Sequence, residues 1–203
     1  MLSAQEDEGE GEEPDYEDPL PSGTDWDSFV YRKGDQVFTL SLGTNFPLAI
    51  LGDSGEKMDN NFVPPVGGVI GPIGYSIFLS DKLPFFAGAE IAFIINPTLS
   101  ESMLFMIPLG LRVGWLFNIN HFEFPLGLTV GVALQRLLDF NYVGLFVKGG
   151  VSAFYRFSPD WSFGLNVDAS WYPQWVPKEE VTGISRNAHG VFLGVTLSAR
   201  YHF

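Results

Sequence analysis

The chain contains no cysteine, which excludes disulfide bonds, thiol catalysis and a lipid-modified amino-terminal cysteine. Charge is also scarce, because only 17% of the 203 residues are Asp, Glu, Lys or Arg. Residues 60–80 are uncharged and long enough to cross a membrane as a helix. They contain Pro64, Pro65, Pro72 and several glycines, however, and a helix does not tolerate helix breakers at that density. A membrane-spanning helix is therefore not predicted.

What the chain does have is apolar and aromatic character. Its mean hydropathy is +0.13, 15% of its residues are aromatic, and it contains 23 glycines. Only helices and closed β-barrels satisfy their backbone hydrogen bonds inside lipid. High hydropathy without a spanning helix therefore favours a transmembrane β-barrel.

The acidic residues are concentrated at the amino terminus. Residues 1–27 contain eleven acids and no base, whereas the rest of the chain sets 13 acids against 11 bases and is nearly neutral. We predict that residues 1–34 are a mostly disordered periplasmic leader. The leader is either a solvated tether or a hook for a basic periplasmic partner or divalent cations, and Trp26, Phe29 and Tyr31 are candidates to dock at the barrel mouth. No region is basic enough to bind nucleic acid.

The last thirteen residues alternate strictly between two kinds of side chain. The positions between the apolar ones carry mostly Gly, Ser and Thr, together with Arg200. A period of two indicates a strand with two unlike faces. Small residues suit the inside of a narrow barrel, and a continuous apolar face suits lipid. The apolar positions are Val191, Leu193, Val195, Leu197, Ala199, Tyr201 and Phe203.

Seven further segments alternate in the same way. Eight strands of about the length that a tilted membrane strand needs predict an all-β fold, an eight-stranded antiparallel transmembrane β-barrel over residues 35–203. The connections after the second, fourth and sixth strands are short, which places both termini in the periplasm. We expect the regular part of the fourth strand to begin at Pro108, because proline cannot donate to a ladder. The further strands are expected at about 35–44, 72–80, 85–95, 103–117, 122–135, 142–157 and 161–172.

Aromatic residues gather near the ends of the strands that meet at the short turns. Trp and aromatic side chains favour the membrane interface, so these residues predict one edge of the apolar band. The residues are Phe85, Trp115, Phe117, Phe122, Phe124, Tyr155, Phe157, Trp161, Tyr201 and Phe203.

Six charged residues fall on the inward face of these strands. Facing lipid would cost about 2–4 kcal/mol for each Arg or Lys at the bilayer midplane. The charges form either a structural network that fills the lumen or a selective pathway, and a barrel of eight strands favours the filled lumen. We expect Glu90 and Arg112 to lie at about the same height and to pair, up to a register slip of a residue or two, with Asp168 near Lys148 as a second layer. The predicted lumen charge network is Glu90, Arg112, Lys148, Arg156, Asp168 and Arg200.

Candidates for chemistry are few. His121, His189 and His202 lack the spacing of metal ligands, and His189 with Ser185 would form a rim site only with an orienting acid, which the same face does not supply. Residues 178–180 are expected to be a solvated part of a loop. We therefore predict that the protein is not an enzyme and has no metal and no cofactor.

The alternating terminal strand that ends in Tyr201 and Phe203 resembles the closing strand of bacterial outer-membrane β-barrels. The resemblance implies that these two residues form an assembly signal for the barrel-assembly machinery. Over residues 35–203 the chain resembles small eight-stranded outer-membrane proteins of the OmpX or OmpW kind, and residues 107–112 are similar to the latter. OmpX-like members are closed and present their loops, whereas OmpW-like members are thought to pass small hydrophobic molecules through a lateral opening.

From this resemblance we predict an integral outer-membrane protein with a narrow lumen that side chains fill, acting as a structural or surface-contact protein. The alternative is an OmpW-like transporter of small hydrophobic molecules. The expected partners are outer-membrane lipids, the barrel-assembly machinery during insertion, and a periplasmic partner of the acidic leader.

Overall fold

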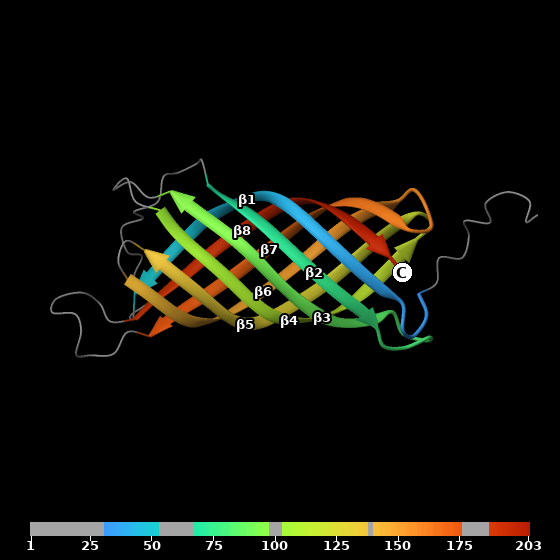
Figure 1. Cartoon of the computed structure of the whole chain (residues 1–203), viewed down its shortest axis with the longest axis horizontal. Helices are drawn as coiled ribbons and strands as arrows, with labels where there is room; N and C mark the ends of the chain where they lie inside the picture. The colour runs from blue at the N-terminus through green and yellow to red at the C-terminus, as the bar shows by residue number, and fades with distance from the viewer. Residues whose placement is uncertain (1–30, 53–66, 98–102, 138–139, 176–186) are drawn as a thin grey trace, which may run out of the picture.

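Eight antiparallel strands close into one barrel in the computed structural model of the chain (Figure 1). The structure describes residues 31–52, 67–97, 103–137, 140–175 and 187–203. Each strand pairs with its neighbours in sequence and the first pairs with the last, which confirms the predicted fold class. The strands are β1 (Gln36–Gly52), β2 (Gly68–Phe78), β3 (Phe85–Pro97), β4 (Met103–Ile119), β5 (Phe122–Leu137), β6 (Phe140–Arg156), β7 (Trp161–Trp175) and β8 (Asn187–His202).

The barrel closes between β1 and β8. Their ladder runs along almost the whole of both strands, with a register shift between Pro47 and Ala49. Beyond the end of β8, the backbones of Phe203 and Gln36 exchange two hydrogen bonds, with N···O distances of 3.0 and 3.4 Å. The terminal strand that the alternation predicts is therefore the strand that closes the barrel.

Three short connections, β2–β3, β4–β5 and β6–β7, lie at the same end of the barrel as the carboxyl terminus and the start of β1 (Figure 1). We call this end the short-turn end and the opposite one the loop end. Between β4 and β5 the chain turns through Asn120, whose φ of 53° is a left-handed conformation that asparagine tolerates. Between β6 and β7 the hydroxyl of Ser158 accepts a hydrogen bond from the amide of Trp161 at 3.0 Å.

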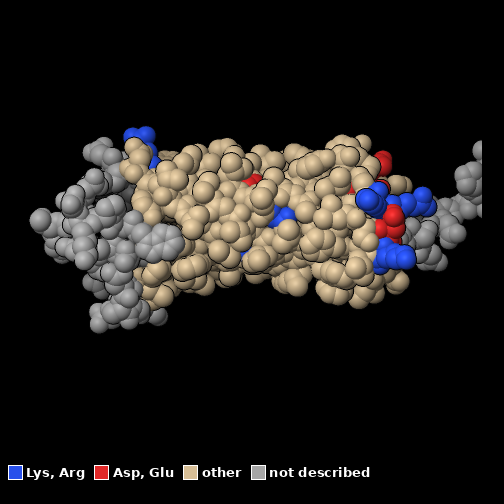
Figure 2. Space-filling view, turned by 90° about the horizontal axis from the view of Figure 1, so that it is seen from below, with Lys and Arg blue, Asp and Glu red and all other residues tan. Residues whose placement is uncertain are grey.

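The outward face of the barrel is apolar along every strand. Leu42, Leu111 and Leu197 are 66%, 73% and 71% exposed, and similar side chains surround them. In Figure 2 the wall shows few charged atoms, most of the charged residues gather at the short-turn end, and a basic group lies at the loop end. An apolar belt of this extent matches the hydrocarbon core of a membrane and not water. None of the residues that the structure describes forms a helix long and apolar enough to cross a membrane.

Inward-facing prolines interrupt three of the ladders. The pairing skips Pro72 and one neighbour between β1 and β2, Pro108 and one neighbour between β3 and β4, and Pro125 and one neighbour between β5 and β6. A proline has no N–H to donate, so each one weakens the ladder on one side only. The prediction that Pro108 begins the regular part of its strand is wrong. β4 begins at Met103, because the residues before Pro108 are already paired with β3 and β5, and Pro108 itself stays paired with Ala133 on β5.

Both strands that flank the first long connection exceed their predicted bounds. β1 continues to Gly52, past the predicted end at Thr44, and β2 begins four residues before Pro72. The register shift between Pro47 and Ala49 explains the first difference, because a bulge changes which parity points inward and so hides the alternation. β7 and β8 extend beyond their predicted ends at the same rim.

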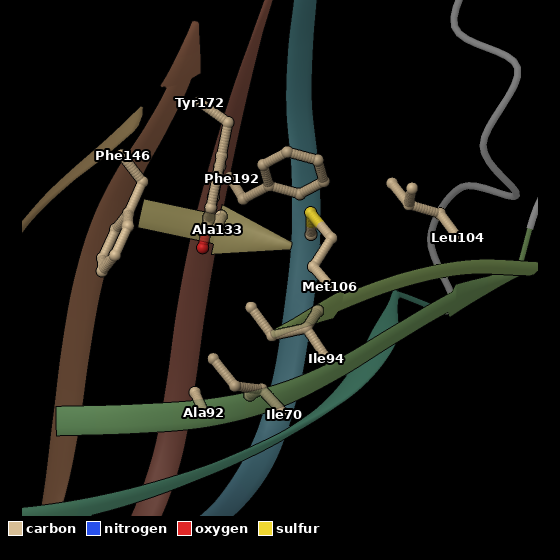
Figure 3. Packing of buried hydrophobic residues seen from close by; sticks show 9 residues of the cluster. All are labelled: Ile70, Ala92, Ile94, Leu104, Met106, Ala133, Phe146, Tyr172 and Phe192. Carbon is tan, nitrogen blue, oxygen red and sulfur yellow. The ribbon is translucent and has the colours of Figure 1, made fainter. Parts of the chain in front are cut away.

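Two apolar clusters occupy the inside of the barrel at different heights. The larger, which we call the loop-side cluster, is built from β2 to β8, and its side chains converge in Figure 3. The smaller, the short-turn cluster, contains Tyr31, Val37, Phe78, Phe86 and Leu116. The loop-side cluster consists of Ile70, Ala92, Ile94, Leu104, Met106, Ala133, Phe146, Tyr172 and Phe192.

Candidate functional site

Glu123 holds two arginines together at the short-turn end of the lumen. Because its neighbours Phe122 and Phe124 face outward, Glu123 points inward from β5. Its Oε2 accepts a hydrogen bond from Nη1 of Arg200 at 2.8 Å, and its Oε1 accepts one from Nη1 of Arg156 at 3.3 Å. All three side chains are buried. Each charge in this group therefore depends on the others for compensation.

Tyr31 brings the segment before β1 into the same group. Its hydroxyl donates to Oε1 of Glu123 at 2.8 Å and lies 3.0 Å from Nδ1 of His202. Its ring stacks on Phe78 at 3.9 Å between centroids, and the Arg156 guanidinium lies 5.3 Å from the ring centre. Burial raises the pKa of the Tyr31 phenol above its ordinary value. Tyr31 thereby closes the lumen at this end.

Ser162 and His202 make a contact that is also found in hydrolases, but here it is structural. The Ser162 hydroxyl lies 3.0 Å from Nε2 of His202. Ser162 is 0% exposed, however, and Nδ1 of His202 faces the Tyr31 hydroxyl instead of a carboxylate. A substrate has no access to this serine. The chain of contacts from Ser162 through His202 and Tyr31 to Glu123 ties β5, β7, β8 and the leading segment together.

A second layer of charge crosses the middle of the lumen. Lys148 on β6 donates directly to Oε1 of Glu90 on β3, while Nη1 of Arg112 lies 3.8 Å from the other carboxylate oxygen. In the ladder Glu90 is opposite Gly110 and Arg112 is opposite Gly88, so the two charged residues are offset by two positions. The predicted ion pair of Glu90 and Arg112 is therefore present despite this offset, and Lys148 is the nearer partner of Glu90.

Asp168 lies near Lys148, as predicted, and the two side chains line the same small cavity, but Lys148 makes its hydrogen bond to another acid. Lys148 reaches across the lumen to Glu90, whereas Asp168 lies opposite Gly150 on the neighbouring strand. Its Oδ1 has no hydrogen-bond partner among the described residues. A Cβ at position 194 would lie 2.8 Å from that oxygen, so Gly194 leaves the space that the carboxylate occupies.

Little empty space remains between the charged layers. The cavity beside Glu90 and Asp168 has a volume of about 40 Å³ and is lined by hydroxyl, amide and charged side chains together with glycines. At about 10–15 Å³ for each water, it holds roughly three molecules. A second space beside Arg112 and Arg200 has a volume of about 10 Å³.

The loop-side cluster fills the other half of the lumen with packed rings. Tyr172 stacks on Phe146 at 5.7 Å between centroids and meets Phe192 edge-on at 5.5 Å (Figure 3). Nearby, Nε2 of Gln174 donates to Oε1 of Gln135 at 2.6 Å. This half of the lumen is closed by packing and not by charge.

The structure places all six predicted lumen charges on the inward face. It brings Glu90, Lys148 and Arg112 together in one layer and joins Arg156 to Arg200 in another. Sequence reasoning missed Glu123, the acid that joins the two arginines, although the outward parity of Phe122 and Phe124 contains that signal. Tyr31 does dock at the barrel mouth, whereas Trp26 and Phe29 lie outside the described residues.

The remaining candidates are placed as follows. Tyr201 and Phe203 meet edge-on at 4.8 Å between centroids, and Phe203 is 63% exposed at the short-turn end. His189 stacks on Trp171, while Ser185 and residues 178–180 lie outside the described residues. Within the described ranges, no group of three or more His, Cys, Asp or Glu side chains could hold a metal ion.

A closed eight-stranded barrel with an apolar outer wall and a filled lumen defines a small outer-membrane β-barrel. Neisserial surface protein A has a similar structure, with a TM-score of 0.58 and 8% identity over 84% of this chain and 97% of that one. OprG from Pseudomonas aeruginosa is similar with a TM-score of 0.49 and 11% identity, over 85% of this chain and 97% of that one. At such low identity, a likeness in structure shows the fold alone.

A protein-family model matches residues 15–201, and the chain belongs to the family that this model defines. Among curated proteins, an uncharacterized protein of Treponema pallidum (strain Nichols) is 26% identical over an alignment of 140 residues that covers 66% of this chain. The match spans 63% of the length of that relative.

Proposed function

We propose that the protein is a closed integral outer-membrane barrel that acts as a structural or surface-contact protein and not as an enzyme. The filled lumen is the observation that carries this proposal. Only about 40 Å³ of space lies beside the central charges, between the Glu123 group and the loop-side cluster. A barrel that passes no solute acts through its wall and through what it presents at its ends.

The proposed orientation places both termini in the periplasm. Gln36 and Phe203 bond to one another at the short-turn end, and short turns are typical of the periplasmic side of such barrels. We further propose that the barrel-assembly machinery recognises Tyr201 and Phe203 during insertion. The acidic leader then lies in the periplasm, where its eleven carboxylates favour a basic partner.

Measurements of solute flux test the proposal. The full chain is folded into liposomes and planar bilayers, with a general porin as the open control. We expect no steady conductance and no swelling in sugar solutions, because the described side chains leave spaces of only about 40 and 10 Å³ beside the central charges of the lumen. Swelling that depends on solute size would overturn the proposal.

An OmpW-like transporter of small hydrophobic molecules is the second candidate. The observation that favours it is the apolar lining of the loop-side half of the lumen, which a hydrophobic solute would enter if rings such as Phe146 and Phe192 moved apart. Transport predicts saturable uptake of a small apolar fluorescent probe into vesicles, and an altered rate in Phe146→Ala. If the barrel is closed, vesicles with the unmutated protein and vesicles with Phe146→Ala should both take up the probe at the same rate as protein-free vesicles.

A further inference from the structure

One charged residue on the strands points away from the lumen. The described strands contain eight Asp, Glu, Lys or Arg residues, and seven of them face inward. The exception is Arg136 near the loop end of β5, which shares the outward parity of Leu134 and is exposed. An arginine on the lipid face is costly at the bilayer midplane and nearly free of cost at the interface.

The position of Arg136 along the barrel axis agrees with a place at the membrane–water interface. Phe124, in the aromatic band at the short-turn end, lies on the same strand and the same face. With about 3.4 Å for each residue and a tilt of about 40°, the two positions are roughly 30 Å apart along the barrel axis. That separation matches the thickness of the apolar core of a bilayer, about 25–30 Å. If the aromatic band marks one interface, Arg136 lies at the headgroup level of the other.

Arg136 also lines a groove on the outer wall. The groove runs over β4, β5 and β6 and has a volume of about 740 Å³. At the part of the groove nearest the loop end, Phe105, Arg136 and Asn141 lie side by side across the three strands. Two residues nearer the membrane centre, the corresponding positions are Ile107, Leu134 and Val143. The groove is therefore polar at the headgroup level and apolar immediately below it.

We infer that this groove binds an anionic, phosphate-bearing lipid of the leaflet at the loop end. A guanidinium presents paired donors that match a phosphate, and Asn141 supplies a neighbouring amide. The acyl chain lies over Ile107, Leu134 and Val143. A second copy of the protein docked symmetrically on this face would bring two Arg136 side chains together, which like charges oppose. The inference goes beyond the proposed function, because it holds whether or not the lumen passes solutes.

Lipid retention measured by native mass spectrometry tests the inference. The full chain is equilibrated in mixed micelles with equal amounts of phosphatidylglycerol and phosphatidylcholine that carry the same acyl chains. We expect phosphatidylglycerol to be retained about five-fold over phosphatidylcholine, since one basic residue near a membrane surface contributes about that factor. Arg136→Gln should bring the ratio close to one, and Arg136→Lys should restore part of it.

Matched variants separate this site from general attraction to the protein. Lys82→Gln removes an exposed charge at the short-turn end and should leave the ratio unchanged. Val143→Trp fills the groove below Arg136 and should lower the retention of both lipids. Heat-dependent gel mobility verifies that each variant is folded. Equal retention by the unmutated protein, an equal loss in Lys82→Gln, displacement of the lipid by inorganic phosphate, or a lipid-free dimer would overturn the inference.

Discussion

The two halves of the lumen are filled by different physical means. At the loop end, aromatic and aliphatic side chains such as Met106 and Phe146 pack against one another without a formal charge. At the short-turn end, Glu123 compensates Arg156 and Arg200, and Tyr31 covers the group. Both arrangements exclude water from a narrow barrel. They differ in how they respond to the loss of one side chain, because a packing defect stays local whereas an uncompensated charge destabilises its whole group.

The largest effect is expected at Glu123. Glu123→Gln leaves two buried arginines without their shared acid, so the free energy of unfolding should fall by about 3–5 kcal/mol in detergent micelles, measured by urea titration. Adding Arg200→Met and Arg156→Met should recover much of the loss. A loss below about 1 kcal/mol, the size expected of an exposed pair, would show that the group is hydrated and does not depend on mutual compensation.

Met106→Ala tests the apolar half in the same titration. The substitution removes a buried side chain from the loop-side cluster and should lower the free energy of unfolding by about 2–5 kcal/mol through lost contacts and the cavity left behind. In contrast to the charged group, a second truncation nearby, such as Ile94→Ala, should add to the loss. If the double variant instead recovered free energy of unfolding, the two halves of the lumen would not differ in their response to side-chain loss.

The middle layer allows two partners of one acid to be compared. Double-mutant cycles for Glu90 with Lys148 and for Glu90 with Arg112 should both show coupling, in the range of about 0.5–3 kcal/mol. The cycle with Lys148 should give the larger value, because Lys148 bonds to Glu90 directly while Arg112 stands 3.8 Å away. A larger coupling with Arg112, or additivity in both cycles, would contradict this assignment of partners.

Tyr31→Phe should have the smallest effect, about 1 kcal/mol, because it removes the hydroxyl contacts and keeps the ring on Phe78. Its effect should also depend on pH. The folded state holds the pKa of Tyr31 above its ordinary value of 10.0, so the unfolded chain loses this proton first as the pH rises. Unmutated protein should therefore lose stability above pH 10 more steeply than the variant. If the stability of both proteins fell equally with rising pH, the Tyr31 hydroxyl would be exposed to water in the folded state.

Much of the fold follows from alternation alone. The faces of the strands, their order and the short connections are predictable, because residues such as Leu111 and Arg112 differ strongly in their preference for lipid. The ends of the strands at the loop end of the barrel are not predictable in this way. There, inward Met106 and Phe146 stand beside outward residues that are also apolar, so the period of two disappears from the sequence. A bulge near Pro47 removes it from β1 as well.

The partners within the lumen depend on register, which alternation does not determine. An offset of two positions separates Glu90 from Arg112, and the reach of a lysine across the lumen joins Lys148 to Glu90 instead of Asp168. The first fact depends on the register of the neighbouring strands β3 and β4, and the second requires the closed barrel, because β3 and β6 are not neighbours. The inward direction of Glu123 was predictable from parity, but its pairing with Arg156 and Arg200 was not.

Conductance of the folded full chain in planar bilayers, beside that of Tyr31→Ala, tests the closed lumen most directly. Tyr31→Ala opens the short-turn end but leaves the Glu90 layer and the loop-side cluster in place. We predict that neither protein carries a steady current, because the Glu90 layer and the loop-side cluster are each sufficient to exclude solutes. A steady single-channel conductance from the unmutated protein would contradict the closed lumen.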